Sequence, residues 1–452
     1  MVELGQKYII EIEDLGHKGE GVGRIQGFTI FVDQGIPGDL LQIQIKVLKR
    51  NYARGEIVKI VQPSEDRVRP KCPYAKNCGG CQLMHMTYRA QLDNKNARIK
   101  ETLERLGKIK TKVEPILGME DPYRYRNKGQ FPLGKMGEET TIGLYQKGSH
   151  NIVDIDKCLI QEPGNENIIA AMREYIKISG ASIYNEATGK GLIRHLCMRV
   201  AFKTDDVMVI IVTKNKNIPQ KEKLIEIFTK KVPGLKSIIQ NINGAKTNVI
   251  FGRENIKLYG KEKITDYIGD IKFNISPLSF FQVNTPQSQV LYDKVVDYAD
   301  LTGNENVFDI YCGIGSIGLY LARKAKKVIG VELVEEAVKD ARENARINNI
   351  KNAEFYTGRA EDLIPQLYKE GTYADLVVVD PPRKGCDERV LETMVKMKPK
   401  KIVYVSCNPA TLARDLAYLE ERGYKTMEVQ PVDMFPHTAH IETIALIQRE
   451  IS

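Results

Sequence analysis

Short apolar runs separated by glycine-containing turns mark the first sixty or so residues as β-structure. Residues Gly19–Gly23 and Ile36–Asp39 have the composition of turns. Closely spaced strands with glycine corners are typical of a small barrel of the oligonucleotide-binding type. We therefore predict an OB-like β-barrel domain over 1–61 with a linker at 62–66 after it. Its strands are expected at Tyr8–Glu13, Phe28–Val32, Leu40–Val47 and Gly55–Val61.

The middle of the chain mixes helical and strand patterns. Apolar residues recur at helical spacing through Tyr88–Gly107, and the glycine ends that pattern. A strand is expected at Val207–Val212 and a helix at Gln220–Lys231. We predict a mixed α/β central domain over 62–269.

From about Asp270 onwards the pattern changes to strand and helix in regular alternation. This order predicts a doubly wound parallel sheet, of Rossmann-like type, over 270–452. A helix is expected after the glycine-rich Cys312–Gly318 and another at Glu335–Asn348. The predicted strands are Val307–Tyr311, Val328–Val331, Ala353–Tyr356, Asp375–Val379 and the run before Cys407, with a final strand at Ile444–Ile447.

Cys407 directly follows the fifth of these strands, and Pro409 stops the strand. Ligands of open α/β sheets bind outside the carboxyl ends of the strands, so a thiol there faces the ligand crevice. The alternative is an inert structural cysteine, which is the commoner role of a buried thiol. We predict that Cys407 is a nucleophile.

The glycine loop suggests an adenosyl cofactor. Gly313, Gly315 and Gly318 match the dinucleotide fingerprint, and Glu332 ends the second strand, where it can bind ribose hydroxyls. This motif alone fits NAD as well as S-adenosylmethionine. Asp380, followed by two prolines at the end of the fourth strand, favours S-adenosylmethionine, because methyltransferases place acid–proline–proline motifs against the methyl donor.

A thiol and a proton acceptor together fit methylation at C5 of uracil. Thiolate addition to C6 makes C5 nucleophilic, and a base must later remove the C5 proton so that the thiol can leave. Glu442 begins the final strand and is the candidate base, with His437 and His440 as rivals. A stacked target base has to be flipped out first.

Three thiols, Cys72, Cys78 and Cys81, lie within ten residues, and the next one along the chain is Cys158. Four thiolates hold either structural zinc or an iron–sulfur cluster. The spacing favours the cluster slightly, and unliganded thiols are the third possibility. The eight cysteines of the chain argue for metal binding or catalysis rather than for disulfides.

The composition adds an expected location and partner. The net charge is +9, no apolar run is long enough to cross a membrane, and no signal segment opens the chain. We expect a cytoplasmic monomer without membrane association. Basic residues are dense between Lys46 and Lys71, and aromatic and basic residues alternate over Tyr123–Lys128. Both stretches suit RNA, although each could also be a solvated surface.

Taken with these motifs, the chain resembles the bacterial uracil-5-methyltransferases that act on 23S ribosomal RNA. The resemblance covers nearly the whole chain and implies a TRAM barrel, a central iron–sulfur domain and a class I methyltransferase domain. It implies Cys407 as nucleophile and Glu442 as general base. It also implies cofactor contacts at Gln282, Tyr311, Glu332 and Asp380, and four ligands of a 4Fe-4S cluster: Cys72, Cys78, Cys81 and Cys158.

Three other functions stay open at this point. The same chemistry could act on transfer RNA. A non-catalytic iron–sulfur RNA-binding protein would need neither Cys407 nor Glu442, and a nicotinamide-linked oxidoreductase would bind NAD instead. Cys386 lies near the same crevice without a role in the motif and is interpreted as incidental; Cys197 and Cys312 have no assigned chemistry either.

Overall fold

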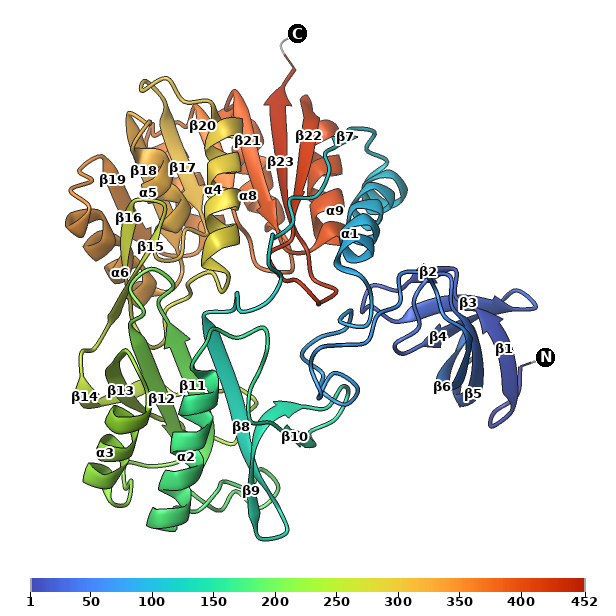
Figure 1. Cartoon of the computed structure of the whole chain (residues 1–452). Coiled ribbons are helices and arrows are strands. Elements are labelled where there is room, and N and C mark those ends of the chain that lie inside the picture. Colours follow the sequence, from blue (N-terminus) through green and yellow to red (C-terminus); the bar gives the residue numbers. More distant parts are fainter. Residues whose placement is uncertain (1, 451–452) are drawn as a thin grey trace. The chain divides into compact units, whose positions relative to one another are not determined.

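The computed structural model describes residues 2–450, which divide into two compact units. The first comprises Met1–Arg98, Tyr145–Val153 and Phe435–His440, and the second Ile99–Leu144, Asp154–Met434 and Ile441–Ser452. Helix α1 (Tyr88–Thr102) and strand β10 (Ile152–Asp154), both labelled in Figure 1, each contain residues of both units. Within residues 2–450 no helix has both the length and the apolar composition that a membrane crossing requires.

A six-stranded sheet of order β1-β5-β6-β4-β3-β2 forms most of the first unit. Its two outer strands, β1 and β2, are only two residues apart in sequence, so the sheet has to curl round. Buried aliphatic side chains such as Ile30, Leu41 and Ile43 fill the inside. The strands are β1 (Lys7–Glu11), β2 (Asp14–Leu15), β3 (Gly21–Ile25), β4 (Phe28–Val32), β5 (Leu40–Leu48) and β6 (Tyr52–Gln62).

The turn expected at Gly19–Gly23 is confirmed only at its start, where Gly19 N donates to the carbonyl of Gly16 at 2.9 Å, because Gly21–Ile25 is strand β3. A Cβ on Gly23 would lie 2.2 Å from the carbonyl oxygen of Glu11, and one on Gly21 would lie 2.8 Å from the main chain of Gly35. These glycines therefore let neighbouring backbones approach closely instead of turning the chain.

A mixed sheet forms the central part of the second unit, with the order β9-β8-β11-β12-β13-β14. Helices α2 (Asn165–Ser179) and α3 (Lys221–Lys231) lie side by side against it (Figure 1). The helix and strand expected here are confirmed within a residue or two. The strands are β8 (Lys128–Met136), β9 (Glu139–Tyr145), β11 (Ile193–Val200), β12 (Val207–Thr213), β13 (Leu235–Ile242) and β14 (Glu254–Gly260), and a hairpin of β15 (Ile264–Ile268) and β16 (Ile271–Ile275) follows.

An eight-stranded sheet of order β19-β18-β17-β20-β21-β23-β22-β7 dominates the rest of the second unit. The strands are β7 (Lys112–Val113), β17 (Asn306–Ile310), β18 (Lys327–Glu332), β19 (Ala353–Thr357), β20 (Leu376–Val379), β21 (Lys401–Ser406), β22 (Tyr424–Val432) and β23 (Glu442–Arg449). Strands β17 to β21 are parallel as predicted, but the sheet is not wholly parallel, because β23 runs antiparallel between β21 and β22.

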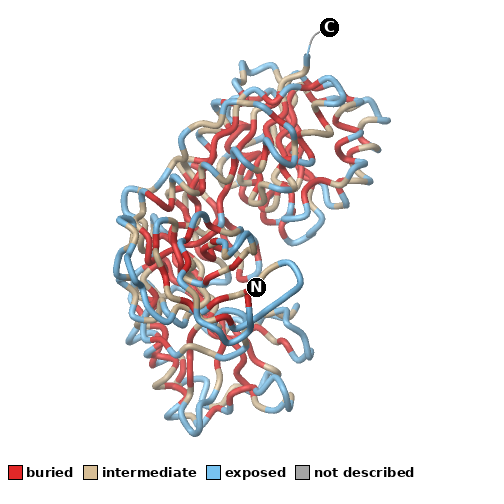
Figure 2. The backbone as a smooth tube through the Cα atoms, turned by 90° about the vertical axis from the view of Figure 1, so that its right-hand side faces the viewer, coloured by how far each residue is buried: buried red, intermediate tan, exposed pale blue. Residues whose placement is uncertain are grey.

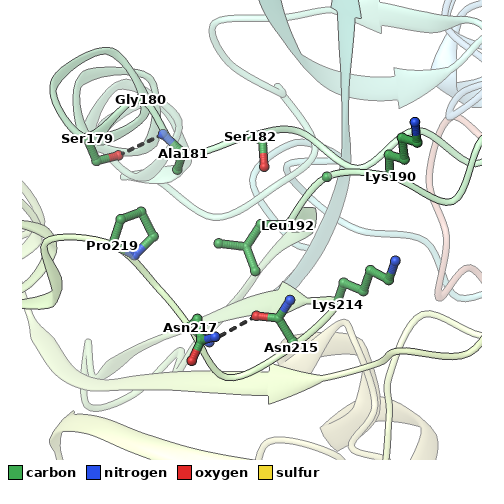
Figure 3. A pocket seen from close by; sticks show the side chains of 11 residues that line it. Ser179, Gly180, Ala181, Ser182, Lys190, Leu192, Lys214, Asn215, Asn217 and Pro219 are labelled. Atoms are coloured by element: carbon green, nitrogen blue, oxygen red, sulfur yellow. Dashed lines mark hydrogen bonds between the residues drawn. The ribbon is translucent and has the colours of Figure 1, made fainter.

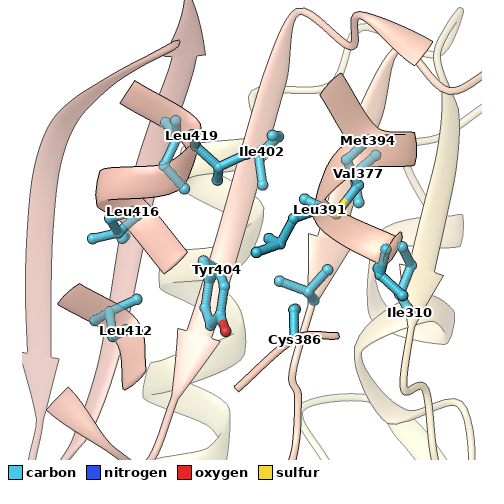
Figure 4. Close-up of a cluster of buried hydrophobic side chains, with 14 of the residues drawn as sticks. Ile310, Val377, Cys386, Leu391, Met394, Ile402, Tyr404, Leu412, Leu416 and Leu419 are labelled. Atoms are coloured by element: carbon cyan, nitrogen blue, oxygen red, sulfur yellow. The ribbon is translucent and has the colours of Figure 1, made fainter. Parts of the chain in front are cut away.

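Helices cover both faces of this sheet. They are α4 (Thr285–Ala299), α5 (Ser316–Ala322), α6 (Glu335–Ile347), α7 (Ala360–Lys369), α8 (Glu388–Met397) and α9 (Pro409–Glu420). On one face α7, α8, α9 and the π-helical turn η1 (Leu103–Gly107) share a core with the strands; Figure 4 shows part of it. Figure 2 shows the buried residues gathered in the interior of the molecule and the exposed residues on its outside. The order of strands and helices gives a Rossmann-like α/β fold.

Candidate active site

Five of the residues predicted for the site lie at one edge of the eight-stranded sheet. Ile310 pairs with both Val331 and Val379, so Tyr311, Glu332 and Asp380 follow three adjacent strands. Ser406 pairs with Thr443 across the antiparallel ladder. Extending that ladder by one residue sets Cys407 opposite Glu442. The strand register thus brings both predicted catalytic residues to the edge with three of the predicted cofactor contacts.

Cys407 occupies the single position between the end of β21 and the cap of α9. Asn408 caps α9 through its side chain, which accepts from Ala410 N at 3.2 Å, and it also donates to the carbonyl of Arg383 at 2.8 Å. Pro409 begins the helix, where the missing N–H costs nothing. Cys407 is half-buried, and the nearby helix N-terminus favours its thiolate form.

The acidic residues near Cys407 oppose the effect of the helix N-terminus on its thiol. Burial and the charges of Glu442 and Asp380 raise the pKa of Cys407 to about 11, while Arg383 lowers it. Burial raises the pKa of Asp380 to about 7. Burial, followed by the charge of Asp380, also raises the pKa of Glu442 well above its usual range. The charges of Glu442, Asp380 and Arg383 therefore all act on the Cys407 thiol.

Arg383 was missed from the sequence. It follows Asp380-Pro381-Pro382 directly, and its carbonyl accepts the bond from Asn408. Its charge lowers the pKa of both Cys407 and Glu442. The available signal was its place directly after the acid–proline–proline motif, where it is the first of two bases, Arg383 and Lys384.

The glycine loop lies beside Glu332. The carboxylate of Glu332 accepts from Gly313 N at 3.1 Å and from Val334 N at 2.9 Å. Gly313 has a φ of 55°, and a Cβ added there would meet no atom within 4 Å, so its backbone is open to a ligand. Tyr311 adopts the left-handed φ of 68° that non-glycine residues rarely take. These features fit an adenosyl cofactor, with an acid for the ribose and an open loop next to it.

Gln282 lies in the segment between β16 and α4 and is 8% exposed. Its carbonyl accepts from Asn127 Nδ2 at 2.9 Å. Two residues later Asn284 caps α4 by accepting from Gln287 N at 3.2 Å. The fourth predicted cofactor contact is therefore in a segment with a fixed backbone.

The rival bases His437 and His440 belong to the first unit. His437 is 3% exposed, and its ring nitrogen Nδ1 lies 3.3 Å from Gln91 Nε2. Its carbonyl accepts from the amides of Gln82 and Leu83. His437 thus has structural contacts of its own, while Glu442 lies at the sheet edge.

The predicted cluster ligands are divided between the two units. Cys72, Cys78 and Cys81 are half-buried in the first unit, and Cys158 is buried in the second. Gly80 N donates to the Cys78 sulfur at 3.4 Å. Residues 2–450 contain no group of three or more His, Cys, Asp or Glu side chains arranged to hold a metal ion. The binding of a cluster by these four thiols stays a prediction.

The other three thiols are structural. Cys386 is 6% exposed and points into the core between Leu391 and Tyr404 (Figure 4), rather than into the crevice near which it was expected. Burial raises its pKa, which keeps it a protonated thiol. Cys197 in β11 and Cys312 in the glycine loop are buried as well.

A separate pocket of about 560 Å³ lies in the central part of the second unit, between the end of α2 and the loop after β12 (Figure 3). Lys190, Lys214, Asn215 and Asn217 are among its lining residues. None of the predicted site residues lines it, so it is distinct from the candidate active site.

The fold and the sheet-edge site define an S-adenosylmethionine-dependent methyltransferase. The family model for tRNA (uracil-5-)-methyltransferase matches residues 87–450, and the model for the TRAM domain matches residues 2–58. The chain therefore belongs to the tRNA (uracil-5-)-methyltransferase family, with a TRAM domain before the methyltransferase fold, and is an RNA methyltransferase. The uracil-5-methyltransferase family expected from the sequence is confirmed.

Individual relatives agree with this assignment. A protein of Caldanaerobacter subterraneus named as an uncharacterized RNA methyltransferase is 52% identical, covering 99% of each chain. One of Clostridium tetani with the same description is 53% identical, over 99% of this chain and 97% of its own. Among solved structures, the Pyrococcus abyssi tRNA (uracil-54, C5)-methyltransferase in complex with S-adenosyl-L-homocysteine matches with a TM-score of 0.79 and 31% identity. The match covers 97% of this chain and 99% of that one.

Proposed function

We propose that this enzyme methylates C5 of a uridine in 23S ribosomal RNA. The observation that supports this chemistry is the pairing of Ser406 with Thr443. Extended by one residue, this pairing sets Cys407 opposite Glu442 at the edge of the sheet where the predicted cofactor contacts lie. The 23S target follows from the resemblance found in the sequence.

Cys407 acts first. Its thiolate adds to C6 of the uracil, which moves electron density to C5 and makes that carbon nucleophilic. The helix N-terminus and Arg383 favour the thiolate, while Asp380 and Glu442 oppose it. The thiol loses its proton to solvent before the attack, so the carboxylate of Glu442 is free to act later.

S-adenosylmethionine, when bound, supplies the methyl group that C5 accepts. We propose Gln282, Tyr311, Glu332 and Asp380 as the residues that hold it. Glu332 suits the ribose hydroxyls because its carboxylate ends β18 beside the open backbone of Gly313. Asp380 ends the neighbouring strand on the side of Cys407.

Glu442 completes the reaction. After methylation C5 carries both a methyl group and a hydrogen, and the carboxylate removes that proton. The electron pair of the C–H bond then forms the C5–C6 double bond, and the sulfur of Cys407 leaves C6. The raised pKa of Glu442 makes its carboxylate a stronger base than an exposed one.

Transfer RNA is the second candidate substrate. The specific observation in its favour is the likeness over nearly the full length to a solved tRNA (uracil-54, C5)-methyltransferase. The reaction and the residues would be the same, and only the RNA would differ.

One assay separates the two substrates. The purified protein is incubated with labelled S-adenosylmethionine and either unmodified 23S ribosomal RNA or unmodified transfer RNA. We expect the label as 5-methyluridine in ribosomal RNA and none with Cys407→Ala. Label in transfer RNA alone would replace the proposed substrate and keep the chemistry. Absence of label in both RNAs would overturn the proposed function.

We further propose that Cys72, Cys78, Cys81 and Cys158 bind a 4Fe-4S cluster. The resemblance to the family found in the sequence supports this proposal. Iron and acid-labile sulfide are measured in protein purified without oxygen. Four irons and four sulfides per chain are expected, and protein free of both would refute the cluster.

A further inference from the structure

The segment between β16 and α4 carries Gln282, and two side chains of the central region hold its backbone. Arg199 comes from β11, and Asn127 directly precedes β8. Both residues belong to the second unit, as does the segment itself. Neither residue was predicted for the site.

Arg199 is 3% exposed, and every bond that its guanidinium makes among residues 2–450 goes to a main-chain oxygen. Nε and Nη2 donate to the carbonyl of Pro277 at 3.3 and 3.2 Å, and Nη2 also donates to the carbonyl of Ser279. A buried guanidinium is costly unless its donors are used, so this geometry ties the segment firmly to β11.

Asn127 holds the other end of the segment and is 4% exposed. Its Nδ2 donates to the carbonyl of Gln282 at 2.9 Å and to Thr285 Oγ1 at 3.0 Å. Its amide donates to the carbonyl of Val283 at 2.8 Å. The peptide plane that follows Gln282 is thereby fixed, and with it the direction in which the Gln282 side chain leaves the backbone.

We propose that Asn127 and Arg199 are positioning residues, which hold the Pro277–Thr285 segment in the shape that binds S-adenosylmethionine. This inference rests on the proposed role of Gln282 as a cofactor contact. A cofactor site loses affinity when its contacts are misplaced by about 1 Å, so the two residues act on binding without touching the ligand.

The chain offers a matched control for Arg199. Arg194 lies in the same strand and is 4% exposed, and its guanidinium also donates to main-chain carbonyls, those of Asn243, Ala245 and Thr247. That loop contains none of the predicted cofactor contacts. Arg199→Lys and Arg194→Lys therefore impose the same chemical change on two different loops.

The affinity for S-adenosylhomocysteine is measured by calorimetry and stability by thermal melting, with Gln282→Ala as reference. We expect Arg199→Lys to weaken binding about tenfold, or ~1.4 kcal/mol, and to raise KM for S-adenosylmethionine more than it lowers kcat. Arg194→Lys should lower the melting temperature about as much as Arg199→Lys does. It should leave the affinity for S-adenosylhomocysteine within about twofold of wild type. Equal affinities for the two Lys variants would overturn the inference.

Asn127→Ser provides a second variant. It is compared with Asn241→Ser, since Asn241 is also buried and donates to the carbonyl of Gly252 at 3.0 Å. We expect only the Asn127 variant to lose affinity. If Gln282→Ala binds as tightly as wild type, the proposed cofactor contact fails. If Gln282→Ala binds weakly but both positioning variants bind normally, only the positioning role fails.

Discussion

Cys407 and the Cys72–Cys81 segment both carry sulfur with predicted chemistry, but they lie in different kinds of local structure. Cys407 ends a buried strand, and its neighbours are set by strand pairing on both sides of β21. The Cys72–Cys81 segment contains no helix and, apart from a single bridge between Cys78 and Gln146, no strand pairing. Short turns supply other contacts, such as the bond from Cys78 N to the carbonyl of Tyr74 at 2.8 Å. Strand register brings distant residues together by geometry, whereas a loop of turns has no such rule.

The largest expected effect is that of removing the Cys407 sulfur. Cys407→Ala should lower the rate of 5-methyluridine formation at least about 10⁴-fold, because no other group can form the bond to C6. Binding of S-adenosylhomocysteine should change little. Methyl transfer to labelled RNA and calorimetry measure the two effects.

Cys386→Ala is the control for that change. This thiol lies in the core, so its loss should cost about 1–3 kcal/mol of stability and leave the folded enzyme active. If Cys386→Ala abolished methylation without lowering the melting temperature, the assignment of roles to these two cysteines would be wrong.

The next largest effect is expected from Glu442→Gln. Without a carboxylate the C5 proton stays, and the sulfur cannot leave C6. The turnover rate should fall about 10²–10⁴-fold, and a covalent protein–RNA adduct should accumulate. The adduct is detected as a band of reduced mobility on a denaturing gel. Detection of the adduct with His437→Gln instead would move the base to the histidine.

The pH dependence gives a smaller effect with a definite sign. Cys407 and Glu442 both act without their proton, and both have raised pKa values, about 11 for the thiol. The value of kcat/KM should therefore rise at least about tenfold per pH unit between pH 6.5 and 8.5, since the thiol alone gives that slope. A profile that is flat over this range would contradict the thiolate as nucleophile.

Arg383→Gln sharpens that test. It removes the cation that lowers both pKa values, so the profile should shift to higher pH by up to about one unit. Arg389→Gln is the control, because Arg389 pairs with Asp362 on the surface. The control should leave the profile in place.

The smallest effect on cofactor binding is expected from a substitution in the Cys72–Cys81 segment. If the cluster prediction holds, Cys78→Ser should remove iron from the protein. Binding of S-adenosylhomocysteine should stay within about twofold, since Cys78 belongs to the first unit and the cofactor contacts to the second. A tenfold loss of affinity would show that the segment supports the methyltransferase fold.

The same comparison explains how much could be predicted from sequence. The sequence pattern of alternating strands and helices predicts that strands end at Tyr311, Glu332, Asp380 and Cys407. Because parallel strands all present their carboxyl ends at one edge of the sheet, these residues are expected there together. The position of Glu442 opposite Cys407 could not be derived from the pattern. It depends on β23 entering the sheet antiparallel between β21 and β22, a choice made by long-range packing.

The proposed positioning residues could not be predicted from the sequence for a related reason. Arg199 lies 83 residues before Gln282, and its importance comes from three bonds to main-chain oxygens, which no side-chain motif records. The glycines of β3 were misread because close approach of two backbones and a tight turn require the same residue type.

The position of β23 between β21 and β22 has a consequence for the polypeptide while it is being synthesised. While a growing chain ends before Glu442, strands β21 and β22 have no common neighbour, and each exposes an unpaired edge. Such edges favour aggregation, so the nascent protein is vulnerable until the next eight residues arrive. The strand that closes this gap begins with the proposed proton acceptor. The proposed proton acceptor is therefore made together with the strand that completes the sheet.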